Sequence, residues 1–359
     1  MTRQIQLGAF LAVCSVAAAA AGALRAGGAA PRAQQLEREI QAVTRQFPEV
    51  GPGVSALKRD AAGRYYVLAL PATSVLVFGP DGKRVGQIPA ANSRATIAYA
   101  EDFDLDRDGR IYVADRGANA VKIFTPDGQL TATIRVAMPA SVVALSGGEV
   151  AVATMHSEHL VDVLDEKGVA IRGIGAPSDI SDKKEVNKLF NRGRICGDPA
   201  GNIYFAFTYL PDPIIKKYDR FGYAAYEIDL SSAEFAPNDK RRDVLRLDRH
   251  ANLPPPQKPT FDAIGVDPDR QDVWAAIGNA LLHFDKDGTR RGTYRTVTKE
   301  GAKLEPKAIL VEPGRLLLAV DPLGIFEFAR PDQTVIEVPV KQGAQEPATG
   351  ALSAPSTSH

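Results

Sequence analysis

The sequence predicts an all-β protein, a six-bladed β-propeller with four strands in each blade. In the stretch 102–134, four short runs of strand-forming residues are separated by Asp-Gly turns and one glycine-containing loop. Weaker copies of this stretch recur along the chain. One small twisted sheet cannot bury both of its faces alone, whereas six sheets packed around an axis can, so the repetition predicts a propeller.

Two series of turns set the number of repeats at six. The turn before the second strand of each unit falls at 62–63, 108–109, 147–148, 200–201, 270–272 and 313–314. The turn before the fourth strand falls at 81–82, 127–128, 167–168, 221–222, 287–288 and 331–332. The first strand of each unit ends, in most units, on an acid that can fix the turn through backbone N–H groups: Asp60, Asp106, Ser146, Asp198, Asp267 and Glu312.

The second unit carries a family resemblance. Ile111–Asp115, followed by Val121–Phe124 and Asp127-Gly128, resembles the NHL-repeat family of six-bladed propellers, and the resemblance extends from 53 to about 340. Ala118 and Ala120 stand where the family usually has Asn and Arg. The resemblance implies the architecture, but it leaves the ligand site open because propellers host many chemistries.

The N-terminal segment 1–32 has the features of an export signal. Arg3 precedes an uncharged, apolar stretch from 5 to 24, and 21–23 (Ala-Gly-Ala) offers a small-residue cleavage site. A cleaved secretory signal fits this alanine-rich run better than an uncleaved membrane anchor, which is the alternative. We therefore expect an extracytoplasmic protein, periplasmic or secreted, in which Cys196 is the remaining cysteine and no intramolecular disulfide forms.

Two further segments flank the predicted propeller, which spans 51–340. Over 33–50, Leu36, Ile40, Val43 and Phe47 recur at helical spacing, which predicts an amphipathic helix, with a linker as the alternative. The tail 341–359 is rich in Ala, Pro, Ser, Thr and Gly and is expected to be disordered.

Composition restricts the class of partner. Lys plus Arg and Asp plus Glu both number 43, so no net field attracts nucleic acid or an anionic membrane surface. We expect a protein, peptide or glycan partner, no nucleic acid, and membrane contact only through an uncleaved N-terminal segment.

Two insertions, 176–192 and 231–260, indicate where that partner binds. Both follow the fourth strand of one blade, so they emerge on the same rim as the loops between second and third strands, opposite the Asp-Gly turns. Arginine, histidine and tyrosine side chains collect on this rim, and such residues are frequent in binding sites. The candidate binding residues are Arg116, Asn119, His156, His159, Arg192, Arg194, Tyr209 and Asp212.

Divalent cations, calcium or zinc, are the cofactors to consider. Asp104, Asp106 and Asp108, with Asp115 at the twelfth position, match the front of a calcium loop, but they also fall on repeat positions with turn duties, which is the favoured interpretation. His156, His159 and His250 are a conceivable zinc set, for which solvated loop histidines are the simpler explanation. Gluconolactonase-like propellers hold a cation at the pore, and the matching positions here are Asp102, Asn191, Asp262 and Glu305.

No G-x-S-x-G, H-E-x-x-H or phosphate-binding P-loop pattern occurs in the sequence. The predicted function is therefore non-catalytic: an exported binding or scaffold propeller that recognises its partner on the face bearing the insertions. The alternative is a metal-dependent hydrolase, lactonase or lyase that acts at the propeller pore.

Overall fold

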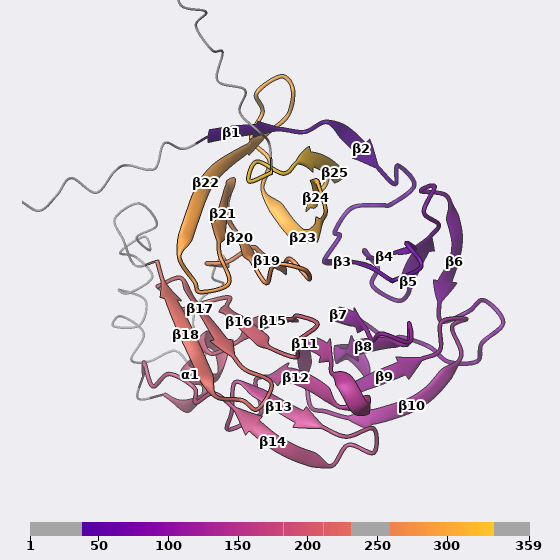
Figure 1. Cartoon of the computed structure of the whole chain (residues 1–359). Helices are drawn as coiled ribbons and strands as arrows, with labels where there is room; N and C mark the ends of the chain where they lie inside the picture. The colour runs from indigo at the N-terminus through magenta and orange to yellow at the C-terminus, as the bar shows by residue number, and fades with distance from the viewer. Residues whose placement is uncertain (1–37, 182, 211, 231–258, 334–359) are drawn as a thin grey trace, which may run out of the picture. The chain divides into compact units, whose positions relative to one another are not determined.

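The computed structural model describes residues 38–181, 183–210, 212–230 and 259–333. Six small sheets lie around a central axis, each with its first strand innermost (Figure 1). This confirms the predicted six-bladed β-propeller. The predicted signal 1–32, the tail 341–359 and most of the insertion 231–260 lie outside the described residues.

The blades follow one another along the chain. Blade 1 comprises β3 (Ala56–Arg59), β4 (Tyr65–Leu68), β5 (Val75–Phe78) and β6 (Arg84–Ile88). Blade 2 comprises β7 (Ala100–Leu105), β8 (Ile111–Asp115), β9 (Ala120–Phe124) and β10 (Leu130–Arg135). Blade 3 comprises β11 (Pro139–Ala144), β12 (Val150–Thr154), β13 (Val161–Leu164) and β14 (Ala170–Ile174).

The second half of the ring repeats this order. Blade 4 comprises β15 (Gly193–Gly197), β16 (Ile203–Phe207), β17 (Ile214–Tyr218) and β18 (Ala224–Asp229). Blade 5 comprises β19 (Ala263–Val266), β20 (Val273–Ile277), β21 (Ala280–Phe284) and β22 (Arg290–Val297). Blade 6 contains β23 (Pro306–Glu312), β24 (Arg315–Val320) and β25 (Gly324–Ala329). The insertion 176–192 contains α1 (Lys184–Phe190), which is the one α-helix in the described part of the chain.

The N-terminal segment closes the ring. Residues 38–41 form β1, which pairs parallel to β22, and residues 44–46 form β2, which pairs antiparallel to β25 and supplies the outer strand of blade 6 (Figure 1). The amphipathic helix predicted over 33–50 is therefore wrong where the structure describes this segment. The reason is that the open edges of β22 and β25 offer unpaired backbone groups, and pairing with them outweighs the local apolar spacing. Within the described residues, 38–46 thus pair with the propeller, although they precede its predicted span of 51–340.

The core lies between the blades. Four of the middle strands are buried along their whole length, as expected for sheets packed on both faces: β4, β8, β16 and β21. One cluster of apolar side chains fills each junction; at the junction of blades 2 and 3, for example, Tyr112 and Val121 pack with Val142 and Val152. Radial packing of the sheets therefore supplies the hydrophobic burial that a single blade lacks.

The acids at the ends of the first strands hold the turns, as the repeat pattern predicts. Asp106 Oδ1 accepts hydrogen bonds from the backbone N–H groups of Asp108 and Arg110, both at 2.9 Å, and its Oδ2 accepts one from Arg110 Nε at 2.7 Å. Asp60 and Asp198 make equivalent bonds in blades 1 and 4. The carboxylate of Asp106, central to the calcium-like pattern, is thus occupied by its own turn.

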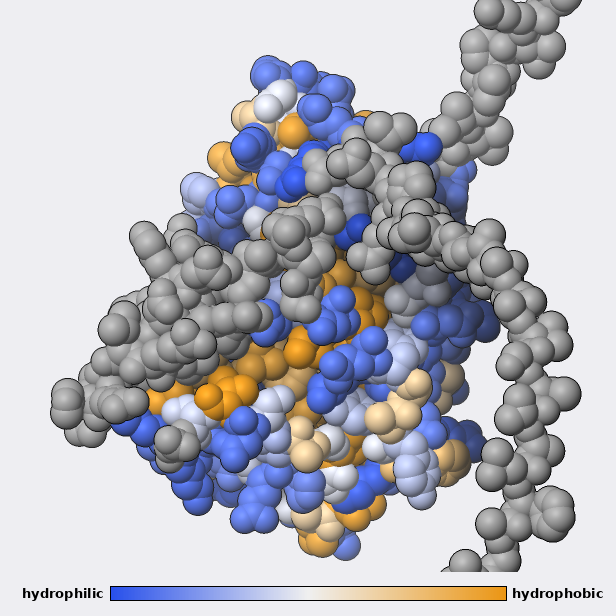
Figure 2. All heavy atoms as spheres, turned by 90° about the vertical axis from the view of Figure 1, so that its left-hand side faces the viewer, coloured by the Kyte–Doolittle hydropathy of each residue, from blue (hydrophilic) through white to orange (hydrophobic). Residues whose placement is uncertain are grey.

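Because the strands within each blade are antiparallel, the connections fall on two faces. The loop face carries 89–99, 116–119, 175–181, 183–192, 208–210, 212–213, 278–279 and 298–305. The turn face carries the hairpin turns at 60–64, 106–110, 145–149, 198–202 and 219–223. Figure 2 shows the side of the propeller at left in Figure 1, where apolar surface lies between hydrophilic patches. No helix within the described residues is long and apolar enough to span a membrane.

Candidate functional site

The innermost strands of all six blades surround a central channel. Its hollow measures about 1420 Å³ and reaches the turn face, where Arg107, Asp108, Pro199 and Asp269 line it. This volume exceeds that of most small-ligand pockets, which measure roughly 300–1,000 Å³. The channel is therefore large enough to hold a small molecule.

Four charged side chains and one thiol line the channel at equivalent positions in three blades. Lys58, Asp104 and Cys196 each lie two residues before the acid that ends the first strand, and Asp102 and Arg194 lie four residues before it. Because side chains two residues apart point to the same face of a strand, these residues share the channel wall. The sequence analysis named Asp102 and Arg194 but missed Lys58 and Asp104 as channel residues, although the repeat register places them there.

An ion pair joins blades 1 and 2 across this wall. Lys58 Nζ lies 2.9 Å from Asp104 Oδ1, and Asp104 Oδ2 accepts a hydrogen bond of 3.0 Å from the backbone N–H of Ala144 in blade 3. Burial alone would lower the pKa of the Lys58 ammonium, but the carboxylates of Asp104 and Asp102 outweigh it and raise that pKa. Lys58 is thus a permanent cation in the channel.

Asp102 is buried and is bound by neighbouring blades. Its Oδ2 accepts a hydrogen bond from the Ser141 hydroxyl, and Ser141 Oγ accepts one of 3.1 Å from the backbone N–H of Ile195. Burial raises the pKa of the Asp102 carboxyl, against the opposing effects of Lys58 and Arg194. This chain of hydrogen bonds links the inner strands of blades 2, 3 and 4.

The structure does not gather the four residues proposed as cation ligands. Asn191 holds the insertion 176–192, since its Oδ1 accepts a hydrogen bond of 2.7 Å from the backbone N–H of Ser178. Asp262 Oδ1 lies 2.6 Å from Lys307 Nζ, and Glu305 lies 3.8 Å from the same ammonium. Within the described residues, Asp102, Asp262 and Glu305 form no group whose oxygens all lie within 4.8 Å of one another.

Three of the predicted binding residues do meet, on the loop face. Arg116 and Arg192 both bind Oε1 of Glu101, Arg192 at 3.2 Å, and the Arg192 guanidinium lies 5.9 Å from the centre of the Tyr209 ring. We call Glu101, Arg116, Arg192 and Tyr209 the arginine cluster. Glu101 was not among the predicted residues, because its role depends on contacts between segments far apart in the sequence.

The remaining predicted binding residues lie elsewhere. Asn119 ends a short turn with φ at 51°, and its Oδ1 accepts a hydrogen bond of 2.9 Å from Met138 N–H, so its role is structural. His156 is exposed, and His159 Nδ1 lies 3.5 Å from Asp162. Asp212 is half-buried in the loop 208–213, and Arg194 belongs to the channel. His250, named in the zinc hypothesis, is outside the described residues.

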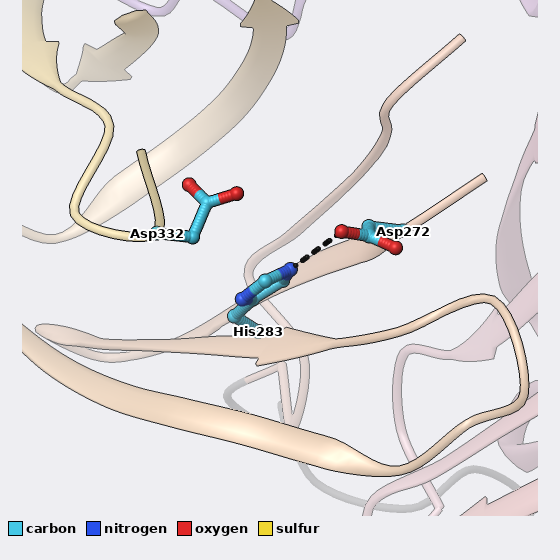
Figure 3. A group of neighbouring side chains, drawn as sticks. All are labelled: Asp272, His283 and Asp332. Carbon is cyan, nitrogen blue, oxygen red and sulfur yellow. Dashed lines mark hydrogen bonds and ion pairs between the residues drawn. The ribbon is translucent and has the colours of Figure 1, made fainter. Parts of the chain in front are cut away.

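A second titratable cluster lies between blades 5 and 6 and was not predicted (Figure 3). His283 Nε2 lies 3.0 Å from Asp272 Oδ2, and Asp332 completes a trio whose ligand atoms lie within 4.8 Å of one another. Two arginines bind the Asp332 carboxylate, Arg330 at 2.8 Å and Arg270 at 2.9 Å. Burial would raise the pKa of Asp332, but its bonds to Arg330 outweigh it and lower that pKa. The arginines already neutralise these acids, so the cluster fastens two blades together.

Comparison with known proteins gives the fold and no more. No family model matches the chain, and no curated protein matches it. Virginiamycin B lyase from Staphylococcus aureus is 12% identical with a TM-score of 0.50, covering 81% of this chain and 99% of that one. A catalytically inactive form of that lyase with quinupristin is 14% identical, with a TM-score of 0.52 and coverage of 81% and 99%. The RRP9 WD40 repeats are 9% identical with a TM-score of 0.52, again covering 81% and 99%.

Proposed function

We propose that this protein is a non-catalytic binding or scaffold propeller that captures a protein, peptide or glycan partner on its loop face. The observation that carries the proposal is the arginine cluster, in which two guanidinium groups share one carboxylate and a tyrosine ring lies beside the guanidinium of Arg192. The Arg116 side chain is 36% exposed and that of Arg192 is 21% exposed. Arginine and tyrosine are enriched among residues that dominate binding energy.

The bonds that Asp102, Asp104 and Asp262 already make favour binding over metal-dependent catalysis. A catalytic cation needs several carboxylate oxygens that converge on one point. Asp102 instead accepts from Ser141, Asp104 from Lys58 and Ala144, and Asp262 from Lys307. The likeness to a lyase is one of fold, and folds of this kind carry both enzymes and binding domains.

The proposal includes an NHL-type propeller outside the cytoplasm. Its support is the resemblance of Ile111–Asp115 and the turn after it to NHL repeats, together with the export features of 1–32. An exported binder would meet its partner without the reducing chemistry of the cytoplasm, and the buried free thiol of Cys196 is compatible with that setting.

Affinity capture from the exported fraction tests this proposal. The wild type is compared with the double variant Arg116→Gln/Arg192→Gln and with the control Arg107→Gln on the turn face, each checked for folding by circular dichroism. We expect the double variant to lose on the order of tenfold or more in affinity for the captured partner, with no loss in the control. If the double variant captures the partner as well as the wild type does, and a chelator abolishes capture by both, the result would instead support the metal-dependent alternative.

A further inference from the structure

Two cationic side chains of the channel, Lys58 and Arg194, have more hydrogen-bond donors than partners among the described residues. The Lys58 ammonium has three N–H donors, and its one ion-pair partner in the described part of the chain is Asp104. The Arg194 guanidinium has five donors, and within the described residues it uses Nη1 alone, in a bond of 2.8 Å to the Ser55 carbonyl. Both side chains line the hollow in which a ligand would lie.

The nearby acceptors are already engaged. Asp102 Oδ1 accepts from the backbone N–H of Phe103 at 2.9 Å and Oδ2 accepts from Ser141, while both oxygens of Asp104 are occupied by Lys58 and Ala144. Lys58 and Arg194 both act electrostatically on Asp102, so the two cations belong to one region of the channel. Each of these oxygens has a partner, whereas most N–H donors of Lys58 and Arg194 have none among the described residues, so the groups left in this region to bind a ligand are mainly donors.

The part of the wall contributed by blades 5 and 6 is mostly apolar. Ala263 and Gly265 of β19 and Ala308 and Leu310 of β23 line the hollow there. Lys307 and Glu312 also line it, but Lys307 Nζ lies 2.6 Å from Asp262 and Glu312 Oε2 lies 2.7 Å from Arg315, and Asp269 stands at the turn-face mouth. Small side chains leave room, and apolar ones offer no hydrogen bond. A ligand that fits both parts of the wall has one anionic end and an uncharged, apolar body.

We propose that the channel binds a small monocarboxylate with an apolar body, whose carboxylate lies between Arg194 and Lys58. A guanidinium fork matches the two oxygens of a carboxylate, and the bonds are charge-assisted. A phosphate dianion suits the site less well, because Asp102 and Asp104 offset the charge of the two cations and would repel a second negative charge. The ligand would enter from the turn face, so this site is separate from the arginine cluster and goes beyond the proposed function.

Titration calorimetry and thermal melts with three probes test this site. The probes are phenylacetate, the neutral 2-phenylethanol and inorganic phosphate, all at matched ionic strength. We expect phenylacetate to raise the melting temperature progressively, because a ligand of the native state stabilises it by mass action. The other two probes are expected to produce no comparable shift. An equal response to 2-phenylethanol or to phosphate, or no response to phenylacetate, would overturn the proposal.

Variants then locate the site. Arg194→Gln and Lys58→Met are each expected to weaken phenylacetate binding about tenfold or more. The control Arg135→Gln, at an exposed position on the outer strand β10, is expected to bind as the wild type does. Two variants are used so that a folding defect in one leaves the other informative. Phenylacetate binding that survives in the folded variants would show that the carboxylate is held elsewhere. Because Arg116 and Arg192 take no part, the outcome is independent of partner capture on the loop face.

Discussion

Replacing Asp115 with asparagine is expected to lower the free energy of unfolding by about 3–5 kcal/mol. Asp115 is fully buried, and its Oδ1 accepts from the backbone N–H groups of Tyr99 and Ala118 at 3.0 and 3.1 Å. Its Oδ2 accepts from Ala98 N–H at 3.0 Å and from Lys122 Nζ at 2.7 Å. Burial would raise the pKa of Asp115, but these bonds outweigh it and lower that pKa.

The magnitude follows from counting donors that lose an acceptor. In Asp115→Asn, Oδ1 can keep the bonds to Tyr99 and Ala118, but the amide nitrogen faces Ala98 N–H and the Lys122 ammonium. A buried donor without an acceptor costs about 1–3 kcal/mol, and more when it is charged. The Lys122 side chain is only 12% exposed, so water compensates for little of this loss.

Guanidinium denaturation of Asp115→Asn, with Asp108→Asn as the matched control, measures the effect. Both acids belong to the calcium-like pattern, but Asp108 is exposed. We expect the control to stay within about 0.5 kcal/mol of the wild type. Equal losses in the two variants, present with calcium and absent after chelation, would refute this reasoning and restore the calcium-loop interpretation.

Three other predictions follow from burial and charge. Phe47→Ala should lower the free energy of unfolding, measured in denaturant, by about 3–5 kcal/mol. The phenyl ring of Phe47 lies 5.1 Å from that of Tyr65 and 4.9 Å from that of Phe78, and a denaturation midpoint equal to that of the wild type would contradict this closure of the propeller. Cys196 is buried, and burial raises the pKa of its thiol to about 12, so iodoacetamide should label it far more slowly in the native than in the unfolded protein; equal labelling rates would disagree. The pKa of Asp332 is lowered from 3.8, so the stability that its carboxylate provides is complete above that pH and is lost as the pH falls further. The free energy of unfolding of Asp332→Asn should therefore fall less steeply than that of the wild type as the pH decreases, and an unchanged pH dependence would count against this.

The propeller could be predicted because its signals are local. An acid such as Asp106 and the glycine three residues later define a turn within a few residues of chain. Blades 1, 2 and 4 carry this pair, and the corresponding turns of the other three blades complete the register. Ring closure could not be predicted in this way. It depends on Arg38–Gln41 pairing with Tyr294–Val297, and edge strands of this length carry no pattern that distinguishes them from a short amphipathic helix.

For the candidate sites too, the positions of the residues could be predicted from local sequence, whereas their contacts between blades could not. Strand register alone places Asp102, Asp104 and Arg194 in one channel, so this neighbourhood could be read from the repeats. The partner that each side chain takes could not be predicted, because Ser141 and Lys58 reach these residues from other blades. Register likewise gives no hint that Arg116 and Arg192 share a carboxylate, since that contact depends on how blade 2 meets the insertion before blade 4.

The central claim is that a partner is captured on the loop face, and a photo-crosslinking residue tests it most directly. The crosslinker is placed at Tyr209 in the arginine cluster and, in a second protein, at Tyr223, which is 74% exposed on the turn face. The account predicts that the partner is crosslinked from position 209 and not from position 223. Adducts from position 223 alone, with the partner still captured, would contradict it.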